Sequence, residues 1–96
     1  MTKTEREHII RVAKLGCIAC KQKGHFTPNV EIHHVRMGNG MGQRASHFEV
    51  LPLCHVHHRT GGHGVAFHAG RHTWEAEFGT EAELLEQVKQ ELGARG

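Results

Sequence analysis

The sequence predicts a small α+β fold in which a pair of strands lies between N-terminal and C-terminal helices. Helical periodicity at both ends of the chain surrounds two short alternating segments. The chain has only 96 residues, so its apolar core is small and a further cross-link is expected. The chain is rich in side chains that bind metals, with eleven histidines and three cysteines. It is poor in large core side chains, with four Phe, one Trp and no Tyr. We therefore expect one metal-stapled domain over residues 1–96, with a core at about 17–68 and a helical extension at about 72–93.

The N-terminal segment carries the signals of a helix over about residues 5–15. Thr4 and Glu7 have the spacing of a capping box, and an apolar stripe runs on until Gly16 ends the pattern. The segment is charged and amphipathic, so it resembles neither a secretory signal nor a membrane span. We expect a reduced, cytoplasmic protein.

Residues 30–35 and 48–51 predict the two strands of a β-hairpin, the second ending at a proline. In the first strand, His33 and His34 point to opposite faces, which separates the two adjacent histidines by role. Residues 36–44 are expected to form a wide glycine-rich loop between the strands.

Helices are expected after the hairpin. A short helix begins at Cys54 and ends at Gly61, and residues 65–78 are helical in part. The Thr80-x-x-Glu83 sequence is a second capping box, and it starts a final helix that ends near Gly93.

Two ligand pairs, Cys17-x-x-Cys20 and Cys54-x-x-His57, have the spacing with which a turn or a helix start presents two donors to one tetrahedral ion. Together they use every cysteine of the chain. We expect a structural Zn²⁺ that ties the end of the first helix to the segment after the hairpin. The alternative is a redox pair of Cys17 and Cys20 with Cys54 as a buried free thiol.

Charge is unevenly distributed along the chain. The formal net charge is +2, but residues 1–71 carry +6 and residues 72–96 carry −4. A basic body suits a polyanion such as DNA, although a solvated acidic helix gives the same numbers without a function. The chain contains no Asp, so a site that ordinarily uses Asp must use Glu or His here.

The order of these motifs resembles the HNH nucleases, which have a ββα-metal fold. It comprises a Cys-x-x-Cys pair, a strand with His33-His34, a glycine-rich loop, a second strand and Leu53-Cys54-x-x-His57-His58-Arg59. The sequence HHRTGGHGVAFHAGRHTWEAEFGTEAELLEQV is further similar to the Ref group of phage RecA-dependent nucleases, over about residues 17–92. The resemblance implies DNA phosphodiester hydrolysis in a bacterial host by a phage or prophage protein.

Phosphodiester hydrolysis needs a base for the attacking water and a cation for the charge that grows on the phosphate. The resemblance implies His34 as the base and His33, His58 and His68 as ligands of the catalytic ion. His57 and His58 can face different sites because one helical step turns the side chain by about 100°. His63 competes with His68, because it is closer to His58 in sequence.

Glu49 stands where the HNH pattern has an Asn, and we expect it to orient His34 or to raise its basicity. An all-histidine ligand set favours Zn²⁺, Mn²⁺, Co²⁺ or Ni²⁺, while the resemblance also allows Mg²⁺.

Four arginines near the motifs are expected to contact phosphates, which gives a grip on DNA with little sequence specificity: Arg36, Arg44, Arg59 and Arg71. The resemblance implies a RecA filament on single-stranded DNA as a partner, and we take a monomer as the default. The rival interpretation is a noncatalytic zinc module that binds DNA or a recombination protein. A thiol enzyme using Cys54 is a third possibility, which zinc ligation of that thiol would exclude.

Overall fold

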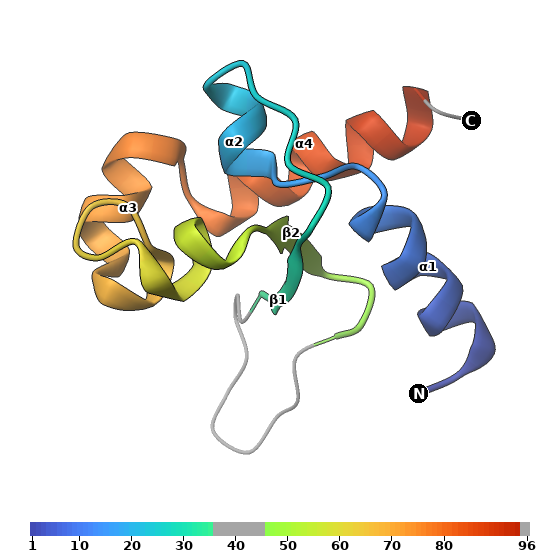
Figure 1. Cartoon of the computed structure of the whole chain (residues 1–96). Helices are drawn as coiled ribbons and strands as arrows, with labels where there is room; N and C mark the ends of the chain where they lie inside the picture. The colour runs from blue at the N-terminus through green and yellow to red at the C-terminus, as the bar shows by residue number, and fades with distance from the viewer. Residues whose placement is uncertain (36–45, 95–96) are drawn as a thin grey trace.

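A computed structural model describes residues 1–35 and 46–94 and shows the expected α+β fold, in which a two-stranded sheet is surrounded by helices (Figure 1). In chain order the elements are α1 (Lys3–Ala13), α2 (Ile18–Gln22), β1 (Glu31–His34), β2 (Val50–Leu53), η1 (Val56–Thr60), η2 (Phe67–Ala69), α3 (Arg71–Phe78) and α4 (Glu81–Ala94). Among the described residues, none of the helices combines the length and the apolar character that crossing a membrane requires.

The two strands pair antiparallel, as the alternation predicted, with Glu31 opposite Leu53 and His34 opposite Val50. The second strand lies two residues later than expected and includes Pro52. The N–H of Val35 donates to the carbonyl of Glu49, so these two residues form a hydrogen-bonded pair. Hydrogen-bonded and non-hydrogen-bonded pairs alternate along antiparallel strands, which makes Ile32 and Pro52 a non-hydrogen-bonded pair. The nitrogen of Pro52 therefore faces away from β1, and the proline removes no bond of the ladder.

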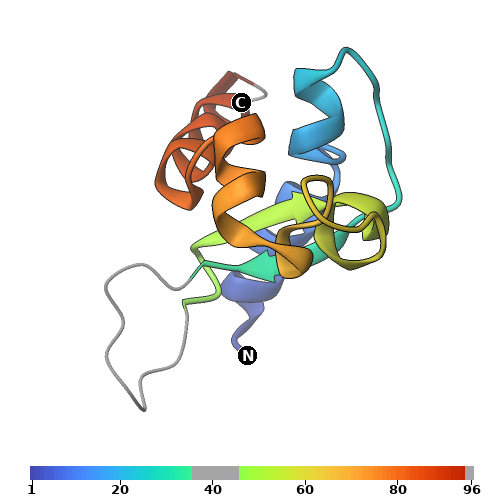
Figure 2. The same cartoon turned by 90° about the vertical axis from the view of Figure 1, so that its left-hand side faces the viewer.

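β2 lies at the centre of the fold. All four of its residues are buried, and α1, α2, α4 and η1 contact it. In Figures 1 and 2 the hairpin lies in the middle of the molecule, below α2 and between α1 and α3. Trp74 of α3 is fully buried, and its ring meets the rings of Phe67 and Phe78 at centroid distances of 5.2 and 4.9 Å. This aromatic group holds α3 against η2, and the ring of Phe67 also meets the ring of His33 on β1 at a centroid distance of 4.5 Å.

α1 begins two residues before its predicted start, because the capping box uses Thr2 and Glu5 rather than Thr4 and Glu7. The chain offers two overlapping Thr-x-x-Glu pairs, and only the first threonine has the extended backbone of an N-cap. The helix also ends earlier, at Ala13, and a turn with φ of +80° at Gly16 follows.

The elements after the hairpin follow the prediction closely. The expected short helix is a single π-helical turn, η1, in which the N–H of Gly61 donates to the carbonyl of Val56. The Thr80 and Glu83 capping box forms at the start of α4. The partly helical segment between them is η2 followed by α3.

Candidate metal centres

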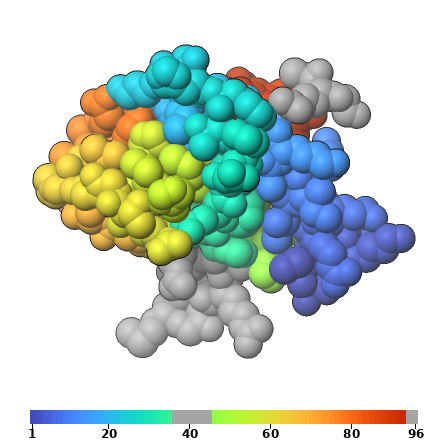
Figure 3. Space-filling view, viewed as in Figure 1, coloured from blue at the N-terminus to red at the C-terminus, as the bar shows by residue number. Residues whose placement is uncertain are grey.

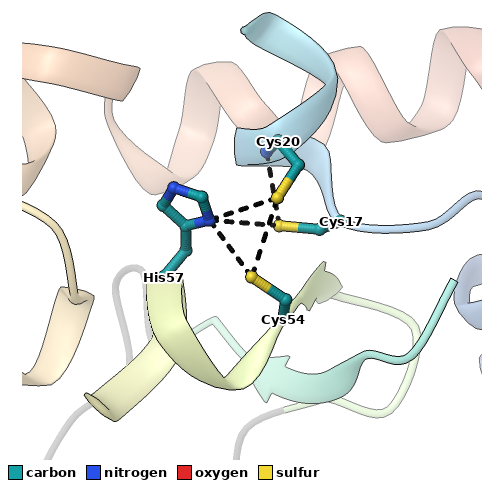
Figure 4. Close-up of side chains that lie close together, drawn as sticks. All are labelled: Cys17, Cys20, Cys54 and His57. Atoms are coloured by element: carbon teal, nitrogen blue, oxygen red, sulfur yellow. Dashed lines mark hydrogen bonds between the residues drawn. The ribbon is translucent and has the colours of Figure 1, made fainter. Parts of the chain in front are cut away.

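Three thiols and one imidazole converge between α2 and η1 (Figure 4). Cys17 caps the N-terminus of α2, Cys20 lies within α2, Cys54 directly follows β2, and His57 lies on η1. The Nδ1 atom of His57 is 3.1 Å from the Sγ of Cys54, 3.4 Å from that of Cys20 and 3.7 Å from that of Cys17. The two sulfurs of Cys20 and Cys54 are 3.7 Å apart. Four donor atoms therefore surround one point.

These distances fit a tetrahedral zinc ion. Zinc bonds of about 2.3 Å to sulfur and about 2.05 Å to nitrogen place two sulfurs about 3.8 Å apart and a sulfur and a nitrogen about 3.6 Å apart. All three cysteines are buried and none forms a disulfide. Burial raises the pKa of the Cys17 thiol to about 12, so the thiolate that a metal requires forms only with a cation beside it. The cluster can hold a metal such as zinc.

A second group of three imidazoles lies on the other side of η1. His33 comes from β1, His58 from η1 and His68 from η2. The Nε2 atom of His58 is 3.3 Å from the Nδ1 of His33 and 3.0 Å from the Nε2 of His68. Two nitrogens that bind one tetrahedral zinc ion are about 3.3 Å apart, so the spacing suits metal binding.

Two glutamates determine which nitrogens of this group carry hydrogen. The Nε2 of His33 is 2.8 Å from a carboxylate oxygen of Glu81, and the Nδ1 of His58 is 2.8 Å from one of Glu31. A carboxylate only accepts, so each of these ring nitrogens donates. In the neutral rings, the lone pairs of His33 Nδ1 and His58 Nε2 therefore face each other and cannot form a hydrogen bond. A cation between them resolves this contact, as in other carboxylate–histidine–metal arrangements.

The imidazoles open into a cleft of about 280 Å³. His34 and the half-exposed guanidinium of Arg71 also line it, together with Ile32, His33, His58, Phe67, His68 and Glu81. The cleft thus places a further imidazole and a positive charge beside the three-histidine group. A cleft with these groups suits an anionic ligand.

Burial favours the neutral, metal-binding form of two of these imidazoles, His33 and His68. The pKa of His33 is lowered by burial, although Glu81 opposes this shift, and burial also lowers the pKa of His68. The Arg59 guanidinium, with His58, lowers the pKa of Glu31 to about 2, so that carboxylate stays ionised.

The structure places the sequence-predicted histidines in two groups. His57 turns to the sulfurs and His58 to the other imidazoles, so one π-helical turn contributes to both groups. His68 joins His58, whereas the Nε2 of His63 is 2.9 Å from the hydroxyl of Thr73 and its Nδ1 faces the carbonyl of Ala69 at 3.4 Å.

The other predicted site residues lie around the cleft or outside the described part of the chain. The backbone carbonyl of Glu49 accepts a hydrogen bond from the N–H of Val35, the residue that follows β1. Arg59 of η1 forms a bidentate pair with Glu31 of β1, in which Nη2 is 2.6 Å from Oε2 and Nε is 3.0 Å from Oε1. On the surface, η1 lies beside the segment between α2 and β1 (Figure 3). Arg71 reaches Glu75 and Glu81. Arg36 and Arg44 lie outside the described residues.

Sequence reasoning assigned no role to Glu31 and Glu81. Glu81 is 3% exposed, an unusual burial for a charged residue, and it joins His33 to Arg71. The available signal was the absence of Asp, which leaves Glu as the only carboxylate that can orient a ligand histidine. That signal does not say which of the glutamates does so.

A family model described as "recombination enhancement, RecA-dependent nuclease" matches residues 1–93 of the chain. The chain belongs to this family. The description points to nuclease activity in recombination, and so to nucleic acid as the substrate and to a relationship with RecA. Both groups of side chains that could hold a metal lie within the matched residues. A comparison with curated proteins found no match.

Proposed function

We propose that this RecA-dependent nuclease family member is a metal-dependent endonuclease of the HNH type, which hydrolyses DNA phosphodiester bonds. The observation that carries the proposal is the group of three imidazoles, in which the Nδ1 atom of His33 and the Nε2 atom of His58 are 3.3 Å apart, in a cleft that His34 also lines. The three imidazoles offer a cation three ligands and leave further positions for a phosphate or water, which is the usual arrangement of a catalytic metal.

The proposed chemistry divides among groups around the cleft. A divalent cation held by His33, His58 and His68 would supply positive charge against the scissile phosphate. His34 accepts the proton of the attacking water, because a neutral imidazole is an effective base near pH 7. Arg71 contacts a phosphate oxygen at the rim of the cleft.

The residues around the three ligands orient them. Glu81 and Glu31 hold His33 and His58 by their distal nitrogens, which fixes each ring with its lone pair toward the cleft. Glu49 is proposed to tune the basicity of His34, and an unchanged pH–rate profile of Glu49→Gln would refute that role. The ion itself is Mg²⁺ or Mn²⁺ in catalysis, and the three imidazoles also suit Zn²⁺ or Ni²⁺.

The thiol group is proposed as a structural zinc site. It would join α2 to η1, and η1 carries His58 at the position next to the zinc ligand His57. Zinc at the thiols would therefore hold the catalytic ligand in place without taking part in the reaction.

The proposed grip on DNA is through phosphates, so little sequence specificity is expected. Arg71 has the position for this contact, and Arg59, Arg36 and Arg44 are proposed to extend it. The family description supports a RecA filament on single-stranded DNA as the partner that directs cutting.

The test is nicking of supercoiled plasmid by the zinc-loaded wild type, by His34→Ala and by His72→Ala. His72 is an exposed histidine of α3 and serves as the matched control. Each protein is assayed with Mg²⁺, with Mn²⁺ and with excess chelator, and again with RecA and single-stranded DNA. Metal content and melting temperature are measured for every variant, so that loss of folding is recognised.

Metal-dependent nicking by the wild type and His72→Ala, lost in His34→Ala, is the expected result. Nicking that survives the chelator would refute a metal-dependent mechanism. No nicking under any condition, by folded protein with both sites loaded, would favour the noncatalytic DNA- or protein-binding module.

A further inference from the structure

His47 lies next to the proposed base and belongs to neither metal-binding group. Its Nδ1 atom is 3.0 Å from the Nε2 atom of His34, and the two rings meet edge to face with centroids 5.1 Å apart. His47 precedes β2, and none of the interpretations above uses it. The contact joins two segments on opposite sides of the loop between the strands.

Two hydrogen bonds and one ring contact hold the turn that carries His47. The hydroxyl of Ser46 accepts the N–H of Phe48 at 3.0 Å, and the carbonyl of Ser46 accepts the N–H of Glu49. The ring of Phe48 packs against the ring of His8 on α1, with a centroid distance of 5.4 Å. His47 therefore has a defined place from which it can position another ring.

A nitrogen–nitrogen hydrogen bond needs a hydrogen on one ring and a lone pair on the other. If His34 donates from Nε2, the lone pair of its neutral ring is on Nδ1. If His47 donates instead, the hydrogen of His34 is on Nδ1 and the bond occupies the lone pair of His34 Nε2. Only the first arrangement keeps the ring lone pair of His34 out of this hydrogen bond.

We propose that His47 is a positioning residue for His34. Its Nδ1 accepts the Nε2–H of His34, which fixes the tautomer and the orientation of that ring. The proposal rests on the proposed function, in which His34 is the base. Loss of the acceptor is expected to reduce single-turnover cleavage about 10- to 100-fold, with little change in DNA affinity.

Two substitutions separate the acceptor from the ring. His47→Asn places an amide oxygen close to the position of Nδ1 and lacks the ring, whereas His47→Phe keeps a ring and lacks the acceptor. His47→Asn is expected to cleave plasmid within about threefold of the wild type, and His47→Phe to show the full loss. His72→Asn is the exposed control. The reverse order, with Phe active and Asn inactive, would show that only ring packing matters and would overturn the proposal.

A second measurement does not depend on cleavage. Nitrogen NMR of the zinc-loaded wild type should show His34 protonated on Nε2, with this tautomer retained in His47→Asn and lost in His47→Phe. A proton on Nδ1 of His34 would overturn the proposal even if the protein is a nuclease. If the expected tautomer is found in a protein without nuclease activity, the proposed function fails while the hydrogen bond stands. Loss of bound metal in His47→Asn would instead identify His47 as a ligand and also overturn the proposal.

Discussion

Glu81→Gln is expected to weaken metal binding at the three-histidine group. The Glu81 carboxylate accepts the Nε2–H of His33 at 2.8 Å, and the two side chains are 4% and 7% exposed. An amide offers that ring a weaker acceptor or a competing donor, and it removes the negative charge that makes the imidazole a better ligand.

The magnitude follows from this burial. Loss of such an outer carboxylate costs about 10- to 100-fold in metal affinity, or about 1.4 to 2.7 kcal/mol. Because solvent hardly screens the Glu81 and His33 contact, we expect the upper part of the range. Glu31, which is 30% exposed and also pairs with Arg59, should give the lower part when changed to Gln.

The assay is calorimetric titration of Mn²⁺ or Zn²⁺ into protein whose thiol group already holds zinc. Glu86→Gln, an exposed change on the same helix, is the control and should leave the affinity unchanged. Equal affinities of Glu81→Gln and the wild type, with equal melting temperatures, would refute the reasoning that Glu81 orients His33.

Three further predictions concern the stability of the fold and its zinc content. Gly61→Ala would place a Cβ 2.5 Å from the carbonyl oxygen of Val56, so it should lower the free energy of unfolding by about 1 to 3 kcal/mol in urea titrations. Gly93→Ala meets open space in α4 and should be neutral or stabilising by up to about 1 kcal/mol, and a similar loss at both glycines would contradict the steric argument. Cys20→Ser should lose about one zinc ion per chain by metal analysis, and an unchanged zinc content and melting temperature would exclude a structural zinc at the thiols. Burial lowers the pKa of His8 from its ordinary 6.5, so the folded state binds fewer protons and the free energy of unfolding should fall as the pH decreases from about 6.5. Removing this group with His8→Asn should flatten the decline between about pH 7 and about pH 5.5, and an unaltered slope would contradict the assignment.

The sequence by itself predicted the helices at both ends of the chain, the two strands and the donor atoms, but not the short helix α2. Capping boxes, strand alternation and paired ligands are local patterns, because they depend on residues one to four positions apart. Local patterns can also be ambiguous: two Thr-x-x-Glu pairs overlap at the N-terminus, and the backbone of Thr2 decided between them. The paired spacing of Cys17 with Cys20 predicted which side chains gather between α2 and η1.

Only the tertiary structure decided which side chains surround the imidazoles. Glu81 is 48 residues from His33 in sequence, and Glu31 is 27 residues from His58. Their contacts arise because α4 and η1 both pack against β2, the strand that pairs with β1, and no local spacing encodes the packing of distant elements. The choice of His68 over His63 depends on tertiary structure in the same way, because η2 places His68 beside His58, whereas His63 precedes η2 and contacts Thr73. The sequence therefore identified the ligand types, and packing across the sheet decided how they are oriented.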